Sequence, residues 1–236
     1  MEPWREYQHR VADLFRELGC IVEVDASVQG IRSRHAIDVW VRFVRFGIRQ
    51  AWVVECKDWQ RAVPQEKVLA LRTIVDDVGA DRGILVAESG HQSGAWASAS
   101  STNITLATLD ELRELAKADL LSRGLVVLSE RCARLRRELH GFWETVEQRH
   151  EGTSHSVTQQ VRFGVDGSAM IQALGTVGII QAGLEEAQLG KPEGLPYGVD
   201  ESGDRILRAP DLESFVAGAS EVLTGLEELV ACQPRK

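Results

Sequence analysis

The chain has 236 residues, 44% of them hydrophobic and 26% charged, so it can bury a sizeable core and does not belong to the disordered class. Its net charge of −8 argues against a protein that coats nucleic acid over its whole surface. No uninterrupted apolar run reaches the roughly 18 residues of a membrane span, and the opening residues MEPWR lack the apolar segment of a secretion signal.

The four cysteines, at positions 20, 56, 132 and 232, are scattered, and none belongs to a Cys-x-x-Cys pair. This usage favours reduced thiols in a protein core over a zinc site or a disulfide framework. We therefore expect a cytoplasmic protein with no membrane partner, built either as one large domain or as a domain of about 120 residues with a smaller one.

The first predicted elements are a helix and a short strand. Apolar residues from Trp4 to Leu18 recur at helical spacing, Pro3 suits a first helical turn, and Gly19 can end the helix. Residues 20–25 then predict a short strand. Residues 27–35, which include a glycine and three basic or potentially basic side chains, predict a loop.

Two apolar runs rich in β-branched residues, 37–41 and 51–57, lie on either side of a short segment that contains Gly47. This pattern predicts a β-hairpin in the middle of a sheet. Three charged residues interrupt the runs: Asp38, Glu55 and Lys57.

The hairpin connection decides which of these charges face each other. A two-residue connection at Gly47-Ile48 would place Asp38 opposite Lys57, whereas one at Phe46-Gly47 would place it opposite Glu55. Because side chains alternate across a strand, either register brings all three charges to one face.

A solvent-facing ion cluster on an amphipathic hairpin is the alternative to a functional site. Carboxylates and lysines are rarely buried without partners, yet these three lie among Ile, Val and Trp. Two carboxylates that converge on one ammonium group therefore favour a functional site.

After the hairpin, the pattern alternates between helices and strands. It predicts a helix from Pro64 to Gly79, a strand at 83–87, a loop at 89–94, a helix at 95–100, a strand at 104–107 and a helix at 109–118. The strand-helix-strand step is parallel and the hairpin antiparallel, so the sheet is expected to be mixed, with helices on both faces.

The C-terminal half contains no catalytic constellation. It predicts a long amphipathic helix at 125–149, a polar and partly β-like stretch at 151–168, an apolar and then acidic stretch at 175–188, a Gly- and Pro-rich loop at 190–204 and a last helix that begins at Pro210-Asp211. We expect residues 119–236 to form a mainly helical region that serves docking, dimerisation or specificity.

The pattern of Asp38, a hairpin and then Glu55-Cys56-Lys57 resembles the catalytic core of the PD-(D/E)xK restriction-endonuclease-like nucleases, and in particular their Mrr-type branch. The resemblance covers residues 1–118 and includes the order of the elements. It implies a restriction-endonuclease-like α/β fold with a mixed central sheet flanked by helices. It also implies an Mg²⁺-dependent endonuclease that hydrolyses phosphodiester bonds in DNA, in restriction or defence, with Mn²⁺ able to substitute.

The resemblance also assigns roles to the residues of the motif. Asp38 and Glu55 would bind the metal together with the backbone carbonyl of Cys56, whose side chain faces the core. Lys57 would orient or deprotonate the attacking water. Oxygen ligands of this kind select a hard cation.

Three further residues match family positions less closely. Glu6 and Gln8 both lie near the position of a glutamate on the first helix that binds metal through water in many family members. Gln65 matches a polar residue that often reaches the active site. Each of the three also suits a place on a helix surface.

The charge distribution agrees with DNA as a partner. Residues 31–72 hold nine Lys or Arg against four Asp or Glu, a local charge of +5 that leaves −13 elsewhere. Cutting both strands usually takes two active sites, which favours a homodimer. The competing hypothesis is an inert nucleic-acid-binding or sensor protein that retains the nuclease fold.

Overall fold

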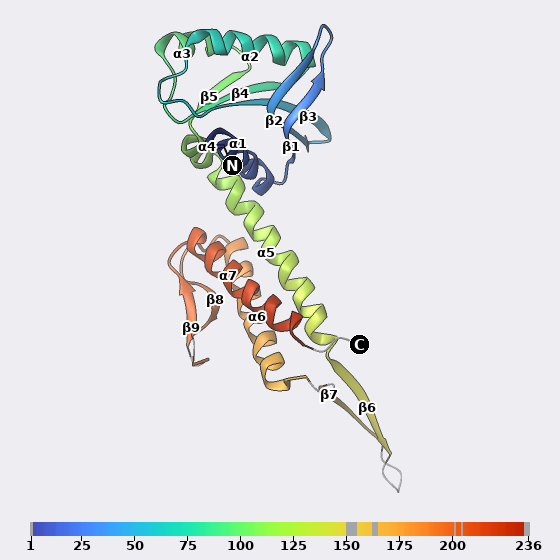
Figure 1. Cartoon of the computed structure of the whole chain (residues 1–236). Coiled ribbons are helices and arrows are strands. Elements are labelled where there is room, and N and C mark those ends of the chain that lie inside the picture. Colours follow the sequence, from blue (N-terminus) through green and yellow to red (C-terminus); the bar gives the residue numbers. More distant parts are fainter. Residues whose placement is uncertain (1, 150–154, 162–164, 201, 204, 234–236) are drawn as a thin grey trace. The chain divides into compact units, whose positions relative to one another are not determined.

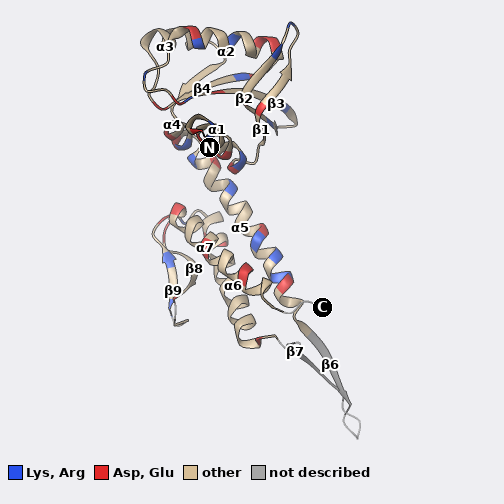
Figure 2. Cartoon of the chain, viewed as in Figure 1, with Lys and Arg blue, Asp and Glu red and all other residues tan. Residues whose placement is uncertain are grey.

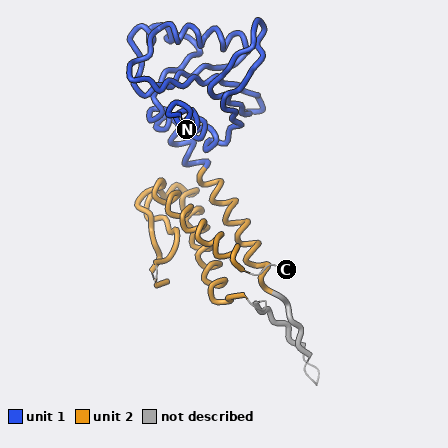
Figure 3. Tube along the Cα trace, in the orientation of Figure 1, with its two compact units in different colours: residues 1–123 blue, residues 124–236 orange. Residues whose placement is uncertain are grey.

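The computed structural model describes residues 2–149, 155–161, 165–200, 202–203 and 205–233. The chain divides into two compact units, residues 1–123 and 124–236 (Figure 3). The single helix α5 (Lys117–His140) begins in the first unit and continues in the second. Each unit has its own core and is described separately.

The first unit contains nine elements before α5. They are α1 (Pro3–Glu17), β1 (Ile21–Gln29), β2 (Arg34–Arg45), β3 (Ile48–Lys57), α2 (Gln65–Val78), β4 (Arg82–Ala87), α3 (Ser93–Ala99), β5 (Ile104–Ala107) and α4 (Leu109–Leu115). The five strands form one sheet in the order β1-β2-β3-β4-β5, antiparallel from β1 to β3 and parallel from β3 to β5 (Figure 1). The predicted mixed α/β sheet is confirmed.

Helices cover both faces of this sheet. On one face, Phe15 of α1 and Leu112 of α4 share a core with Val54 of β3. On the other face, the core joins buried residues of α2 and α3 to strand residues such as Leu71 and Val53. Full burial of such side chains stabilises the fold by about 1.5–3 kcal/mol each, so the central strands are held from both sides.

The β2–β3 hairpin has a two-residue connection, because Arg45 pairs with Ile48. Phe46 and Gly47 both have positive φ, 53° and 76°, as a type I′ turn requires. Of the two predicted registers, the one with its connection at Phe46-Gly47 is therefore observed.

The predicted loop at 27–35 is wrong at both ends. Residues 27–29 belong to β1 and residues 34–35 to β2, which leaves only residues 30–33 outside the strands. Pairing with β2 from Gln29↔Arg34 onwards extends β1 beyond what its own polar sequence indicates.

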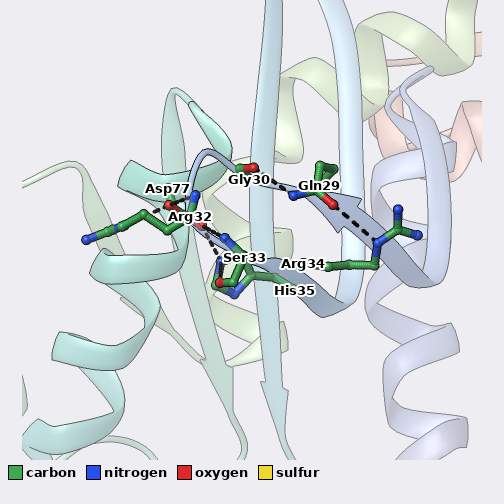
Figure 4. Close-up of polar contacts among 7 residues, drawn as sticks. All are labelled: Gln29, Gly30, Arg32, Ser33, Arg34, His35 and Asp77. Atoms are coloured by element: carbon green, nitrogen blue, oxygen red, sulfur yellow. Dashed lines mark hydrogen bonds and ion pairs between the residues drawn. The ribbon is translucent and has the colours of Figure 1, made fainter.

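The short loop at 30–33 is fastened to α2 by Asp77 (Figure 4). The buried Asp77 carboxylate accepts hydrogen bonds from the backbone N–H groups of Arg32 and Ser33 at 2.9 and 3.2 Å, and it also contacts the side chains of Arg32 and His35 at 2.8 and 2.7 Å. Gly30 passes so close that an added Cβ would lie 2.3 Å from Asp77 Oδ2. The tip of the β1–β2 hairpin is thus fixed by one carboxylate.

The second unit combines helices with two hairpins. After α5 come β6 (Trp143–Arg149), β7 (His155–Val161), α6 (Gly167–Gln188), β8 (Leu195–Val199), β9 (Ile206–Ala209) and α7 (Leu212–Ala231). Its core draws on all three helices and includes Leu135, Ile180 and Phe215. The mainly helical C-terminal region is confirmed.

Two boundaries of this unit differ from the prediction. The helix expected at 125–149 begins earlier, at Lys117, and ends at His140, where Gly141 follows and β6 then pairs with β7. The loop expected at 190–204 contains β8, which pairs with β9. In both cases the next strand along the chain supplies hydrogen bonds that the periodicity of the segment itself does not reveal.

The helix α6 is long and apolar enough, by length and composition alone, to cross a membrane. Gln172, Thr176 and Gln181 interrupt its apolar sequence. Its buried side chains, Met170 and Ile180 among them, belong to the core of the second unit. A helix that is buried in a protein core can have the same length and composition.

The cysteines only partly match the expectation of core thiols. Cys56 and Cys132 are buried and Cys20 is half-buried, but Cys232 is exposed at the end of α7. Burial raises the pKa of the Cys132 thiol to about 11, so this thiol is unreactive at neutral pH.

Candidate active site

Asp38, Glu55 and Lys57 converge at one end of the β2–β3 pair. Lys57 Nζ lies 3.8 Å from Asp38 Oδ2 and forms a hydrogen-bonded ion pair with Glu55. All three side chains are largely buried, with 24%, 23% and 15% of their surface exposed for Asp38, Glu55 and Lys57. The predicted convergence is therefore observed, and the charges do not form a freely solvated cluster.

The local course of β2 explains how Asp38 reaches this position. Ile37 and Val39 lie two residues apart, yet they are buried in the two different cores, so regular alternation breaks at Asp38. The pairing of β2 with β3 ends at Val39 and Val54. Just beyond it, Asp38 Oδ2 accepts a hydrogen bond of 2.8 Å from the backbone N–H of Cys56.

The surroundings of Asp38 disfavour its charged form. Burial is the main cause of a raised pKa, and the nearby Glu55 carboxylate adds to it. The Cys56 N–H, the Lys57 ammonium and a hydrogen bond from the Gln8 side chain act in the opposite direction. Two carboxylates are thus held together in a poorly solvated position, where a further cation would be stabilising.

The two candidate residues on α1 have different positions. Gln8 is only 3% exposed and hydrogen-bonds to Asp38, whereas Glu6 is exposed on the helix surface. The Oε1 atom of Gln8 is buried and has no hydrogen-bond partner. The structure therefore brings Gln8 to the carboxylates and leaves Glu6 away from them.

Gln65, the first residue of α2, is exposed. Its side chain lies against α3: a Cβ added to Gly94 would be 3.3 Å from Gln65 Oε1. Gln65 makes no described hydrogen bond to the three charged residues, so the structure does not join it to them.

One family model matches the first half of this chain. Residues 1–116 match the family model Mrr_cat, described as restriction endonuclease. Residues 1–116 are a restriction endonuclease family domain. The candidate site and the five-stranded sheet both lie inside this domain.

Two solved structures share weaker likenesses with the chain. One, titled as a protein of unknown function, AF1548, is 15% identical with a TM-score of 0.42 and is matched over 97% of this chain and 98% of that one. The other, the DNA modification-dependent restriction endonuclease AspBHI, is 18% identical with a TM-score of 0.35, over 48% of this chain and 30% of that one. No curated protein matches the sequence.

The restriction endonuclease domain offers oxygen atoms to a cation. Among the described residues, no cluster of three or more His, Cys, Asp or Glu side chains has the arrangement of a metal site. The Asp38 and Glu55 carboxylates and the unpartnered Gln8 Oε1 are nonetheless all oxygen donors. Such a set suits a hard cation that keeps several water ligands, as Mg²⁺ does.

Acidic residues from elsewhere in the domain neutralise part of the positive charge at 31–72. Of the nine basic residues at 31–72, Arg32 pairs with Asp77 and Arg42 with Glu23, both acids from outside that stretch. Along α2, the basic residues Lys67 and Arg72 lie between the acidic Glu66 at its start and the acidic pair 76–77 at its end (Figure 2). Any binding of a polyanion would therefore depend on particular side chains and not on a general basic face.

Sequence reasoning did not single out a second group of residues close to the motif. Trp59 follows Lys57 by two residues, and the cationic groups of Arg61 and Lys67 both lie over its ring. The signal available in the sequence was an aromatic residue with basic neighbours directly after β3, a combination that is typical of nucleic-acid contacts.

Proposed function

We propose that this chain is an Mg²⁺-dependent endodeoxyribonuclease whose active site contains Asp38, Glu55 and Lys57. The observation that carries the proposal is the convergence of these three charges, largely buried, within a restriction endonuclease family domain. A domain selected only for binding would have no need to keep two carboxylates and a lysine in a poorly solvated cluster.

Phosphodiester hydrolysis requires an activated water, neutralisation of charge on the phosphate and stabilisation of the leaving oxygen. When bound, Mg²⁺ supplies charge neutralisation and lowers the pKa of water. Asp38 and Glu55 would hold it, with the Cys56 backbone carbonyl and, through water, Gln8. The hydrogen bond from Cys56 N–H keeps the Asp38 carboxylate in one orientation.

Lys57 would act on the water and the phosphate. Its ammonium group lies between the two carboxylates, where it can orient the attacking water and offset the phosphate charge. Action as a general base would require loss of its proton, which the neighbouring carboxylates oppose and a bound cation favours.

The alternative is an inert nucleic-acid-binding or sensor protein with the same fold. One observation favours it: Lys57 contacts both carboxylates, so the three charges partly neutralise one another. In that case the three residues would be a structural ion cluster, and metal would affect neither stability nor activity.

The deciding experiment incubates the full chain with plasmid, linear, modified and branched DNA. Mg²⁺ or Mn²⁺ should support cleavage, Ca²⁺ should support binding with little turnover, and rising salt should weaken binding. Robust cleavage in excess EDTA would contradict metal dependence. A protein that cuts no DNA form and whose melting temperature does not respond to metal would be the inert alternative.

The biological setting and assembly are part of the same proposal. A role in restriction or defence accords with the family of residues 1–116. A homodimer would place one site on each DNA strand, and residues 124–236 form a separate unit that could serve such an assembly. Sedimentation of the full chain with and without DNA tests the dimer.

A further inference from the structure

Trp59 lies in the segment that leaves the catalytic strand β3 and leads to α2. Arg61 Cζ is 5.9 Å and Lys67 Nζ is 5.6 Å from the centroid of its ring. The two cations come from different elements, Arg61 from the segment itself and Lys67 from the first turn of α2. Two cationic groups therefore lie over the same indole ring.

The position of this indole is well defined. The Trp59 side chain packs against the core that contains α2 and α3, and its backbone carbonyl accepts a hydrogen bond from Ser89 Oγ. The same segment is tied to the following loop at Val63, whose N–H donates to Gly90 O at 2.9 Å and whose carbonyl accepts from Gln92 N at 3.0 Å. The ring is therefore a fixed platform.

The two cations are available to an external anion. Both Arg61 and Lys67 are exposed, and neither forms an ion pair with the residues that the structure describes. Two like charges beside one ring repel each other, so this arrangement is most favourable when an anion lies between them. A cation above a ring also keeps its N–H donors free on the side away from the ring.

The short distance along the chain between Lys57 and Trp59 indicates that the anion is a phosphate of the DNA backbone. Two residues of chain separate Lys57 from Trp59 and span at most about 7 Å, and phosphates on one DNA strand follow each other every 3.4 Å or so along the axis. A phosphate bound by Arg61 and Lys67 would thus lie one or a few nucleotides from the one that is cut.

We propose that Trp59, Arg61 and Lys67 form a phosphate clamp that binds the DNA backbone beside the scissile phosphodiester. This inference rests on the proposed nuclease function and names the part of the substrate that these residues contact. The clamp contacts a phosphate and no base, so it contributes affinity and register without sequence preference.

The test measures binding of a fluorescent DNA duplex by anisotropy, in Ca²⁺, over a series of salt concentrations. Each phosphate contact adds about 0.9 to the slope of log Kd against log salt concentration, so the double variant Arg61→Gln/Lys67→Gln, which removes the contact to one phosphate, should lower this slope by about 1. Trp59→Leu, which removes the ring face, should lower it as well, whereas Trp59→Phe should retain most of it. Thermal melts check that each variant is folded.

Arg72→Gln is the matched control, because Arg72 is an exposed cation on the same helix α2 and away from Trp59. Equal slopes for wild type, double variant and control would overturn the clamp, as would an equal fall in the control. A larger fall with RNA than with DNA would overturn the DNA assignment. Clamp-dependent binding by a wild type that cuts no DNA would support the clamp and overturn the proposed nuclease.

Discussion

Asp38 Oδ2 accepts a hydrogen bond from the backbone N–H of Cys56 at 2.8 Å, one step beyond the last pair of the β2–β3 ladder. A side-chain carboxylate thus takes an N–H group that a neighbouring strand would otherwise have bound. The contact lies where the pairing of β2 with β3 ends, and the Lys57 ammonium group lies 3.8 Å from the same carboxylate oxygen.

This relationship predicts the effect of Asp38→Asn. The amide oxygen of asparagine can still accept the Cys56 N–H, so the melting temperature should change little. The loss of one ligand charge should weaken Mg²⁺ binding and lower plasmid cleavage by roughly 10²–10³-fold, and Glu55→Gln should do the same. Calorimetry with Mg²⁺ and cleavage assays measure both effects. Asp110→Asn, at an exposed position on α4, should change neither, and full activity of Asp38→Asn would rule out its role.

Lys57→Ala should distinguish a catalytic role of Lys57 from a purely structural ion cluster. Removal of a cation beside two carboxylates should leave Mg²⁺ affinity equal or higher, while turnover falls by at least about two orders of magnitude. If the residues form only a structural ion cluster, the same change would leave buried carboxylates unpaired and reduce the free energy of unfolding by about 3–5 kcal/mol, with no response to metal. Thermal melts with and without Mg²⁺, alongside cleavage assays, distinguish the two results.

The sequence allowed the prediction of the first unit because its signals are local. Apolar periodicity located the helices and strands, and Gly79 ends α2 with φ of 67° as such a glycine should. The hairpin register remained open because a type I′ turn at Phe46-Gly47 needs positive φ at a phenylalanine, which an aromatic residue seldom adopts. The strand pairing outweighed that local preference.

The features that the sequence did not reveal depend on contacts between different elements. Helical spacing placed Glu6 and Gln8 near each other but could not tell that only Gln8 faces the carboxylate of Asp38. The same holds for β8, whose sequence of Leu, Pro, Tyr, Gly and Val becomes a strand only beside β9. Partners outside the element itself leave no periodic trace in its own sequence.

Gln8 provides a third prediction, because its Oε1 atom is buried without a partner. Gln8→Leu removes an unsatisfied polar atom at similar volume but also the hydrogen bond to Asp38, so the two effects oppose each other and stability should change by no more than about 1 kcal/mol. If Oε1 helps to hold the water shell of a cation, Mg²⁺ affinity should fall about tenfold in the same variant. Calorimetry and thermal melts measure the two effects independently.

Glu6→Gln is the control for this experiment, since Glu6 is exposed on the same helix. It should alter neither affinity nor stability. A loss of metal affinity in Glu6→Gln but not in Gln8→Leu would reverse the assignment of the two residues.

The last prediction concerns Asp77 and the stability of the first unit at low pH. Hydrogen bonds from Arg32 above all, and also from His35, hold the pKa of the Asp77 carboxyl well below its usual range. A carboxyl whose pKa is lowered by folding contributes stability that is complete above its unfolded value of about 3.9 and is lost as the pH falls further towards its folded value. The difference in melting temperature between wild type and Asp77→Asn should therefore be constant near pH 5 and become smaller towards pH 3.

The control is the neighbouring Asp76→Asn, at an exposed position. Its difference in melting temperature from wild type should not become smaller as the pH falls. A difference for Asp77→Asn that does not change with pH would mean that the hairpin tip is held by the shape of the side chain and not by its charge.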